Sequence, residues 1–299
     1  MRPLDLIPVP SALGAPDAGT TEGPEALRQA GLPAALHHAG LVAHWQSPVR
    51  PHRLPEAHDE AARWSALNAL CTDLSDRVSA SVRGNRMPLV IGGDHAIAAG
   101  TWRGVASALH GPLGLLWLDA HLDAHTPEDS VSANPHGMPL ALLLGDGPLP
   151  LAHPTLSPAH VCVVGCRSWE LPERGRLLRY GVRIIDQAEI AQRGLPSVLE
   201  EALDIVSEGT VGFGLSVDLD VFDPSDAPGV NSPVSGGTSP EQWFTALQGL
   251  ARHPDCRALE LVECDGRRDK QGDKPGRTAA LGCRLMETLL AQGGLAAVA

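Results

Sequence analysis

The stretch LGLLWLDAHLDAHTP, residues 113–127, decides the fold. Its first six residues carry no polar side chain, which is typical of a strand in a sheet that helices cover on both faces. Asp119, His121 and Asp123 follow directly where that strand should end. Because ligands bind beyond the carboxyl ends of strands in open parallel sheets, the stretch predicts a functional site as well as a strand.

Similar short apolar runs recur along the chain and alternate with helical patterns. The predicted strands are Leu4–Val9, Pro88–Ile91, Leu113–Leu118, His160–Val164, Val182–Ile185, Val211–Val217 and Ala258–Val262. The predicted helices, each with one apolar stripe, are Ala61–Val82, Ser197–Ser207, Pro240–Ala251 (with Ser239 as its N-cap) and Thr278–Ala291. This alternation predicts βαβ units and a three-layer α/β/α fold with a mostly parallel central sheet.

Nothing in the sequence divides the chain. There is no composition break, long linker or internal repeat, and the Pro- and Gly-rich stretches 127–150, 223–240 and 264–277 resemble long loops that leave strands. Loops of that length in a compact domain are usually functional. We therefore expect a single domain that spans residues 1–299.

Composition limits the classes of partner. The net charge is −12 and no basic run occurs, so nucleic acid and anionic membranes are poor partners, whereas a cationic substrate or bound metal ions would suit the surface. No apolar run reaches the length of a membrane span, and the first residues lack the pattern of a secretory signal. The six cysteines form no CxxC pair, which indicates reduced thiols in a cytoplasmic protein.

Polar residues gather at the ends of four predicted strands. PLVIGG leads into Asp94 and His95, VGFGLSV leads into Asp218 and Asp220, and LELV leads into Glu263. Among these residues, four carboxylates and two imidazoles should meet at one edge of the sheet, namely Asp119, Asp123, Asp218 and Asp220 with His95 and His121. If residues 119–123 stay extended, their alternate side chains point to one side.

Such a set of side chains predicts bound divalent cations, because so much negative charge cannot be buried without compensation. Six ligands exceed the needs of one tetrahedral site. A carboxylate-rich set without thiolates suits manganese better than structural zinc, although imidazole also binds zinc, iron, cobalt and nickel.

Each motif alone has an ordinary explanation. Gly-Gly-Asp marks turns, surface loops often carry two aspartates and a histidine, and an Asp-Pro pair ends many strands. All three motifs in this order, each at a strand end, make coincidence a poor explanation.

IGGDHAIAAG (91–100), LWLDAHLDAHTP (116–127) and SVDLDVFDPSDAPGV (216–230) resemble the three signature motifs of the ureohydrolases. This family contains arginases, agmatinases, guanidino-acid hydrolases and formimidoylglutamases. The resemblance extends from GPEALRQAGL (23–32) nearly to the C-terminus, and it implies an enzyme that hydrolyses a small cationic guanidino compound and releases urea.

The resemblance implies two manganese ions per chain. One ion would be held by His95, Asp119, Asp123 and Asp218, and the other by Asp119, His121, Asp218 and Asp220, with Asp119 and Asp218 shared. A solvent-derived hydroxide would lie between the two ions, and two metals at such a spacing lower the pKa of shared water.

The resemblance also implies three catalytic roles. Asp123 would accept a hydrogen bond from the hydroxide and aim it at the guanidinium carbon. His136, in NPHGMP, would pass a proton to the leaving amine, and Glu263 would grip the planar guanidinium through a bidentate contact. Asp94 and Asp223 would organise loops around the site.

The residues expected to bind the substrate tail only partly match the arginase pattern. Ser132 and Asn134 fit the segment that contacts the α-carboxylate, whereas His125 replaces the usual asparagine. Glu170 stands where arginases place an aspartate near the α-amino group, and Ser168 replaces another aspartate. We therefore expect L-arginine or a close analogue to be preferred over agmatine, and a homo-oligomer, a trimer or hexamer, as is common in the family.

Other functions remain open at this point. Agmatinase, guanidino-acid hydrolase and formimidoylglutamase activities use the same metal motifs, and a non-catalytic metal-binding homologue would share the fold. A binuclear metallophosphoesterase has less support, since the sequence offers no basic loop to cradle a phosphate.

Overall fold

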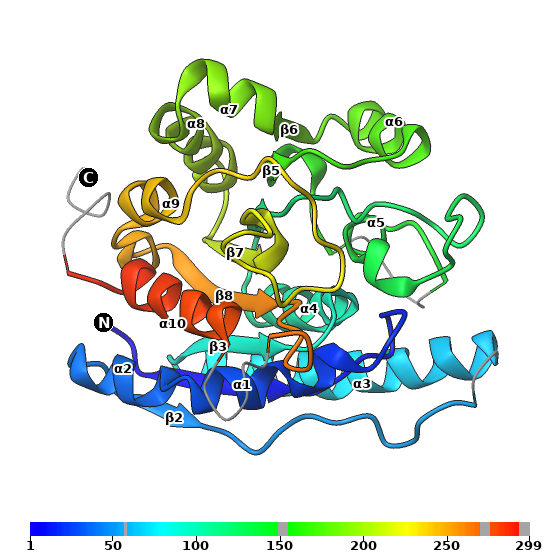
Figure 1. Ribbon diagram of the computed structural model, residues 1–299, viewed down its shortest axis with the longest axis horizontal. Coiled ribbons are helices and arrows are strands. Elements are labelled where there is room, and N and C mark those ends of the chain that lie inside the picture. The colour runs from blue at the N-terminus through cyan, green and yellow to red at the C-terminus, as the bar shows by residue number, and fades with distance from the viewer. Residues whose placement is uncertain (57–58, 149–154, 270–275, 293–299) are drawn as a thin grey trace.

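The computed structural model describes residues 1–56, 59–148, 155–269 and 276–292. Within them eight strands form one sheet in the order β2-β1-β3-β8-β7-β4-β5-β6, and every neighbouring pair is parallel (Figure 1). The strands are β1 (Leu4–Val9), β2 (Ala43–Trp45), β3 (Met87–Gly92), β4 (Gly114–Leu118), β5 (Val161–Cys166), β6 (Arg183–Asp186), β7 (Phe213–Asp218) and β8 (Cys256–Val262).

Helices cover both faces of this sheet. They are α1 (Gly23–Gln29), α2 (Leu32–His38), α3 (Glu60–Arg83), α4 (Ala98–Ala108), α5 (Pro139–Leu143), α6 (Leu171–Tyr180), α7 (Gln187–Arg193), α8 (Leu195–Ser207), α9 (Pro240–Leu247) and α10 (Arg277–Leu289). Alternate residues of β4 enter two separate hydrophobic cores. Leu116 and Leu118 pack in the core that includes α8, α9 and α10, and Leu115 and Trp117 pack in the core that includes α3 and α4. The three-layer α/β/α prediction is confirmed.

The seven predicted strands are all present, and their ends either match or are shifted by one or two residues. The sequence did not reveal β2, which has three partly exposed residues at the edge of the sheet. The apolar stripe of α3 is buried as expected, and the side chain of Ser239 accepts a hydrogen bond from the Gln242 N–H at the start of α9.

The predicted helix Pro240–Ala251 is too long. α9 ends at Leu247, since Gly249 takes a left-handed φ of 72° and a 3-10 turn, Leu250–Arg252, follows.

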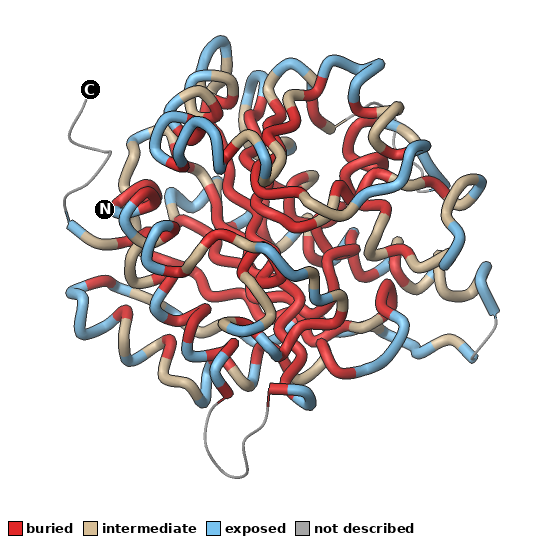
Figure 2. The backbone as a smooth tube through the Cα atoms, turned by 45° about the horizontal axis from the view of Figure 1, so that its top comes forward, coloured by how far each residue is buried: buried red, intermediate tan, exposed pale blue. Residues whose placement is uncertain are grey.

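The predicted loops contain further structure. The segment 127–150 includes a 3-10 turn (Pro135–Gly137) and α5, while its last residues, 149–150, lie outside the described residues. Residues 270–275 of the predicted loop 264–277 also lie outside them. Buried residues gather in the middle of the molecule (Figure 2). Among the described residues no helix combines the length and apolar character needed to span a membrane.

Candidate metal centre

The four polar clusters lie side by side because β3, β8, β7 and β4 are neighbours in the sheet. His95 follows β3, Glu263 follows β8, Asp218 ends β7 and Asp119 follows β4. All four strands run in the same direction, so their carboxyl ends meet at one edge. The prediction that these clusters converge is confirmed.

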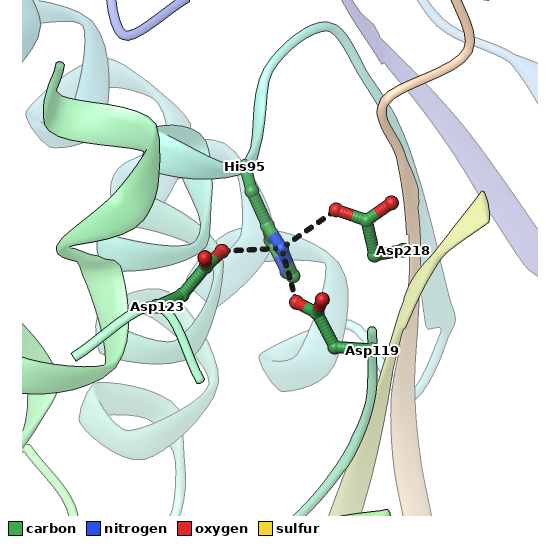
Figure 3. Close-up of side chains that lie close together, drawn as sticks. All are labelled: His95, Asp119, Asp123 and Asp218. Carbon is green, nitrogen blue, oxygen red and sulfur yellow. Dashed lines mark ion pairs between the residues drawn. The ribbon is translucent and has the colours of Figure 1, made fainter. Parts of the chain in front are cut away.

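Two groups of side chains at this edge could each hold a metal ion. In the first group, His95 Nδ1 lies 3.2 Å from Asp119 Oδ2, 3.0 Å from Asp123 Oδ2 and 3.3 Å from Asp218 Oδ2 (Figure 3). The second group contains Asp119, His121 and Asp220.

Asp119 belongs to both groups. Its Oδ2 faces His95, whereas its Oδ1 lies 3.5 Å from His121 Nδ1, which in turn lies 2.9 Å from Asp220 Oδ2. Asp218 has only its Oδ2 in the first group, because its Oδ1 accepts a hydrogen bond from the Asp220 N–H at 2.8 Å. The geometry therefore supports a shared role for Asp119, and sharing by Asp218 stays a prediction.

The expectation of an extended segment after β4 is wrong. Residues 119–122 bend, and Asp123 has a φ of 48° in the left-handed region. The bend is stabilised by Asp119 Oδ1, which accepts the His121 N–H at 2.6 Å. Aspartate side chains commonly make such bonds with the backbone two residues on. A turn, and not the alternation of a strand, brings these ligands together.

Buried contacts orient the ring of His95. Its Nε2 lies 3.0 Å from Ser216 Oγ, and the Ser216 hydroxyl donates to Glu260 Oε2 at 2.7 Å, so Ser216 accepts a hydrogen bond from His95. Trp102 Nε1 also donates to Glu260 Oε2, and the ring of Trp117 stacks on His95 with centroids 4.1 Å apart.

This arrangement directs His95 Nδ1 at three carboxylates and leaves it without a hydrogen-bond partner. A nitrogen lone pair among carboxylate oxygens is a ligand set for a cation. The residues present therefore fit a divalent metal.

The electrostatics of the centre indicate a deficit of positive charge. Burial, with the charge of Asp119 added, raises the pKa of Asp123 to about 7. Burial also raises the pKa of Asp218 well above its usual value, and repulsion from Asp220 and Asp119 raises it further. Burial lowers the pKa of His95, but the nearby carboxylates of Asp119, Asp123 and Asp218 outweigh this effect and raise that pKa well above normal. Bound cations would supply the missing charge.

Glu263 and His136 form a second feature beside the metal groups. Glu263 Oε1 accepts the His95 N–H at 2.8 Å and lies 3.2 Å from His136 Nδ1, while Glu263 Oε2 is buried without a partner. Glu263 has a φ of 63°, a strained conformation for a residue with a side chain, and such strain clusters at functional sites.

A cavity of about 420 Å³ opens above the centre. Its lining includes residues of both metal groups together with His136, Glu263 and four tail positions, namely His125, Ser132, Ser168 and Glu170. Asn134 is not among the residues that line it. A larger cavity of about 1120 Å³, between residues 10–22 and 50–63, contains none of these side chains.

Some supporting residues were not predicted. Ser216 precedes the motif aspartate by two residues, and Glu260 is a carboxylate in the middle of the apolar strand β8. A carboxylate inside a buried strand needs a partner, so Glu260 could have been recognised from that signal. Asp94 and Asp223 hold loops as expected, since Asp94 accepts the Gly14 N–H and Asp223 accepts the Gly236 N–H.

Comparison with known proteins agrees with this geometry. The sequence pattern of the Arginase family matches residues 3–291. An arginase of Bacillus caldovelox is 36% identical over 301 residues, which cover 98% of this chain and 99% of the relative. An arginase of Bacillus subtilis (strain 168) is 35% identical over 297 residues, which cover 97% of this chain and 98% of the relative.

Solved structures give the same result. The Bacillus caldovelox arginase superimposes with a TM-score of 0.89 at 36% identity, and covers 99% of this chain and 100% of its own. The Entamoeba histolytica arginase in complex with L-ornithine has a TM-score of 0.86 at 25% identity, and covers 97% and 98%. Full-length similarity in sequence and structure, together with the two metal-ligand groups, shows that the chain belongs to the arginase family.

Proposed function

We propose that the protein is an arginase-type hydrolase that binds two manganese ions and cleaves the guanidinium group of L-arginine into urea and L-ornithine. The observation that carries this proposal is the pair of metal-ligand groups joined by Asp119, below a cavity that also contains the unpartnered oxygen of Glu263. Full-length relatives named arginase support the choice of substrate.

The metals would be held by six side chains. The first site would use His95, Asp119, Asp123 and Asp218, and the second would use Asp119, His121 and Asp220. Asp218 would complete the second site, as the family resemblance implies. When bound, two such cations supply the Lewis acidity that makes water a nucleophile at neutral pH. An oxygen-rich set with two imidazoles suits manganese.

The residues beside the metals orient the substrate and move protons. Glu263 Oε2 accepts the guanidinium N–H groups, because this oxygen is buried and has no other partner. His136 is held by Glu263 Oε1 and donates a proton to the leaving amine. Asp123 accepts a hydrogen bond from the attacking water and directs it at the guanidinium carbon; Asp123 lines the cavity, which supports this role.

The cavity mouth receives the tail of the substrate. Glu170 accepts hydrogen bonds from the α-ammonium group, and Ser132 and Asn134 donate to the α-carboxylate. Both Glu170 and Ser132 line the cavity, which supports this orientation.

We further propose a single domain over residues 1–299, a cytoplasmic location and a homo-oligomer. One sheet with a core on each face supports the single domain. All six cysteines are free and buried, which suits a reducing compartment. The oligomer, a trimer or hexamer, rests on the family alone.

The test is urea release by manganese-loaded protein from L-arginine, agmatine, 4-guanidinobutyrate and guanidinoacetate, with formamide release from formiminoglutamate as a further arm. We expect the highest kcat/KM with L-arginine. Equal or higher efficiency with agmatine would overturn the arginase assignment and leave the family chemistry intact. Formamide as the main product would indicate a formimidoylglutamase.

A further inference from the structure

His125 lies at the mouth of the cavity with both ring nitrogens facing carboxylates. Nδ1 lies 2.9 Å from Asp129 Oδ1, while Nε2 lies 3.4 Å from Glu170 Oε2 and 3.6 Å from Glu173 Oε1. The His125 side chain is only 12% exposed. Because carboxylates face both ring nitrogens, a substrate carboxylate would meet negative charge on either side of the ring.

Asp129 is a fixed anchor for Nδ1. Its carboxylate accepts the Thr126 N–H at 3.0 Å and an Arg176 N–H at 2.6 Å, and Arg176 also donates to the Ala124 carbonyl at 2.6 Å. Burial raises the pKa of Asp129, but hydrogen bonds from Thr126, Arg176 and His125 outweigh it and lower that pKa to about 2. The Asp129 side of the His125 ring therefore carries a permanent carboxylate in a defined place.

On the Nε2 side, one carboxylate is fixed and the other is open to solvent. Glu173 is 5% exposed, and its two oxygens accept the Glu170 N–H at 2.8 Å and the Ala124 N–H at 3.3 Å. The Glu170 side chain is 55% exposed and lines the cavity. Glu170 is thus the more exposed of the two carboxylates of this cluster that line the cavity.

The charges of the cavity wall favour a cationic tail. Among the described residues that line the cavity there is no lysine or arginine, whereas Glu170 and Glu173 stand at its mouth. For a substrate carboxylate the lining offers neutral hydroxyl groups such as that of Ser132, and no guanidinium or ammonium group.

We propose that His125 is a positioning residue, which holds the Glu170 carboxylate at the cavity mouth through Nε2 so that the substrate tail is recognised chiefly by its ammonium group. This inference rests on the proposed function and refines it. It replaces the direct contact between His125 and the substrate carboxylate that the family resemblance implies.

Two matched pairs of substrates test the selectivity. 5-Guanidinopentanoate is L-arginine without its α-ammonium group, and agmatine is L-arginine without its carboxylate. We expect the first change to lower kcat/KM by at least about tenfold more than the second, as the loss of a hydrogen bond to a charged group would do. A larger loss with agmatine than with 5-guanidinopentanoate would overturn the inference.

Two substitutions of His125 separate the contacts of its two nitrogens. The amide nitrogen of glutamine replaces Nε2, and that of asparagine replaces Nδ1. His125→Gln should therefore retain the preference for L-arginine over 5-guanidinopentanoate, whereas His125→Asn should lower it by about tenfold, to the level of Glu170→Gln. Adding His125→Asn to Glu170→Gln should cause no further change if His125 acts through Glu170.

The exposed His110, with the same two substitutions, provides the matched control. A purely structural role would lower kcat/KM for both substrates equally in His125→Asn, and glutamine would not rescue the preference; either result would overturn the inference.

Titration calorimetry of L-ornithine and 5-aminopentanoate with the manganese-loaded protein tests the same ammonium contact without turnover. The two compounds differ only in the α-ammonium group, so the ratio of their Kd values measures that contact. A weaker preference for L-ornithine in His125→Asn would uphold the inference even if no urea were released, in which case the proposed function alone would fail. An unchanged binding preference would overturn the inference, whatever the urea assay shows.

Discussion

Asp119 presents one carboxylate oxygen to each group of metal ligands, so its removal should affect both. We expect Asp119→Ala to reduce bound manganese from about two equivalents to less than one and to abolish urea release. The remaining buried carboxylates would then repel each other without a common cation. Metal analysis after reconstitution and desalting measures the change.

Asp204→Ala, an exposed aspartate on α8, is the control and should keep both metals. A variant of Asp119 that retained two equivalents would show that the shared ligand is another residue.

Glu263 is expected to act on both the guanidinium and His136. Glu263→Gln should lower kcat/KM for L-arginine by a hundredfold or so, comparable with the roughly 2–5 kcal/mol lost when a buried charge pair is broken. The metal content should be unchanged, because neither group of metal ligands includes Glu263. Steady-state kinetics with metal analysis separate the two effects.

The pH profile of the same variant tests the proton donor. Burial lowers the pKa of His136, but Glu263 raises it, to about 9, so the protonated donor is lost only as the pH rises through that value. In Glu263→Gln the pKa of His136 should fall, and the loss of activity should begin at lower pH. If the wild type and Glu263→Gln lose activity at the same alkaline pH, another group donates the proton.

At the scale of single residues, the sequence predicted the metal ligands better than the residues that hydrogen-bond to those ligands. His95, Asp119 and Asp218 follow apolar strands, so their convergence could be deduced. Ser216 and Glu260 act through side-chain contacts between β7 and β8, and pairing between distant strands cannot be read from either segment alone.

At the scale of helices and strands, Arg167 connects the end of β5 with the loop after β7 through hydrogen bonds. Its guanidinium donates to the carbonyls of Asp220 and Phe222 at 2.8 and 3.0 Å, and to that of Val234 at 2.8 Å. Lysine has one nitrogen and cannot reproduce these contacts. Arg167→Lys should therefore weaken manganese binding by about tenfold, as is typical when a residue that hydrogen-bonds to a metal ligand is replaced.

Manganese titration measures this loss, with the exposed Arg193→Lys on α7 as the control. Equal affinities in the two variants would mean that the loop keeps Asp220 in place without Arg167.

Asp5 connects β1 with three other segments. It accepts hydrogen bonds from Gln46 after β2, Ser81 in α3 and Arg86 before β3. Burial raises the pKa of Asp5, but these contacts, led by Arg86, lower it below 3.8 overall. Asp5→Asn should cost about 2 kcal/mol in the free energy of unfolding at neutral pH, as expected for lost bonds to a buried charge.

Because the folded-state pKa of Asp5 is depressed, its contribution is present above the ordinary value of 3.8 and is lost as the pH falls through the lowered pKa. Urea denaturation of the metal-free protein should show the gap between wild type and Asp5→Asn closing at acid pH. If the difference in unfolding free energy between the two proteins does not change with pH, the charge of Asp5 is not what stabilises this edge of the sheet.

The elements themselves were predictable where apolar runs are long, as in β4 and α3. Short elements were not. β2 has three half-exposed residues, and α4 is rich in alanine and glycine and begins directly after a turn motif. Their structure depends on the neighbours against which they pack, and local sequence does not specify those neighbours.

For the whole molecule, metal binding should contribute directly to stability. The ligands come from segments more than 120 residues apart in the chain, His95 and Asp218, so the unfolded chain cannot bind metal as the folded protein does. At a metal concentration a hundredfold above Kd, the expected gain is about 2.7 kcal/mol, or a rise in Tm of roughly 4 °C.

Calorimetry with and without manganese measures this shift, which should increase with metal concentration. Asp119→Ala serves as the control and should show little shift. Equal shifts in both proteins would mean that manganese binds elsewhere.

The position of β8 has a consequence for biosynthesis. β8 pairs with β3 on one side and β7 on the other, although it is the last of the described strands in chain order. Until residues 256–262 have been translated, the strands before β8 could at most form two partial sheets, β2-β1-β3 and β7-β4-β5-β6, and β3 and β7 would each lack a partner on one side. Such edges are templates for aggregation. A premature stop before β8 would therefore yield an insoluble polypeptide that depends on chaperones, and not a smaller enzyme.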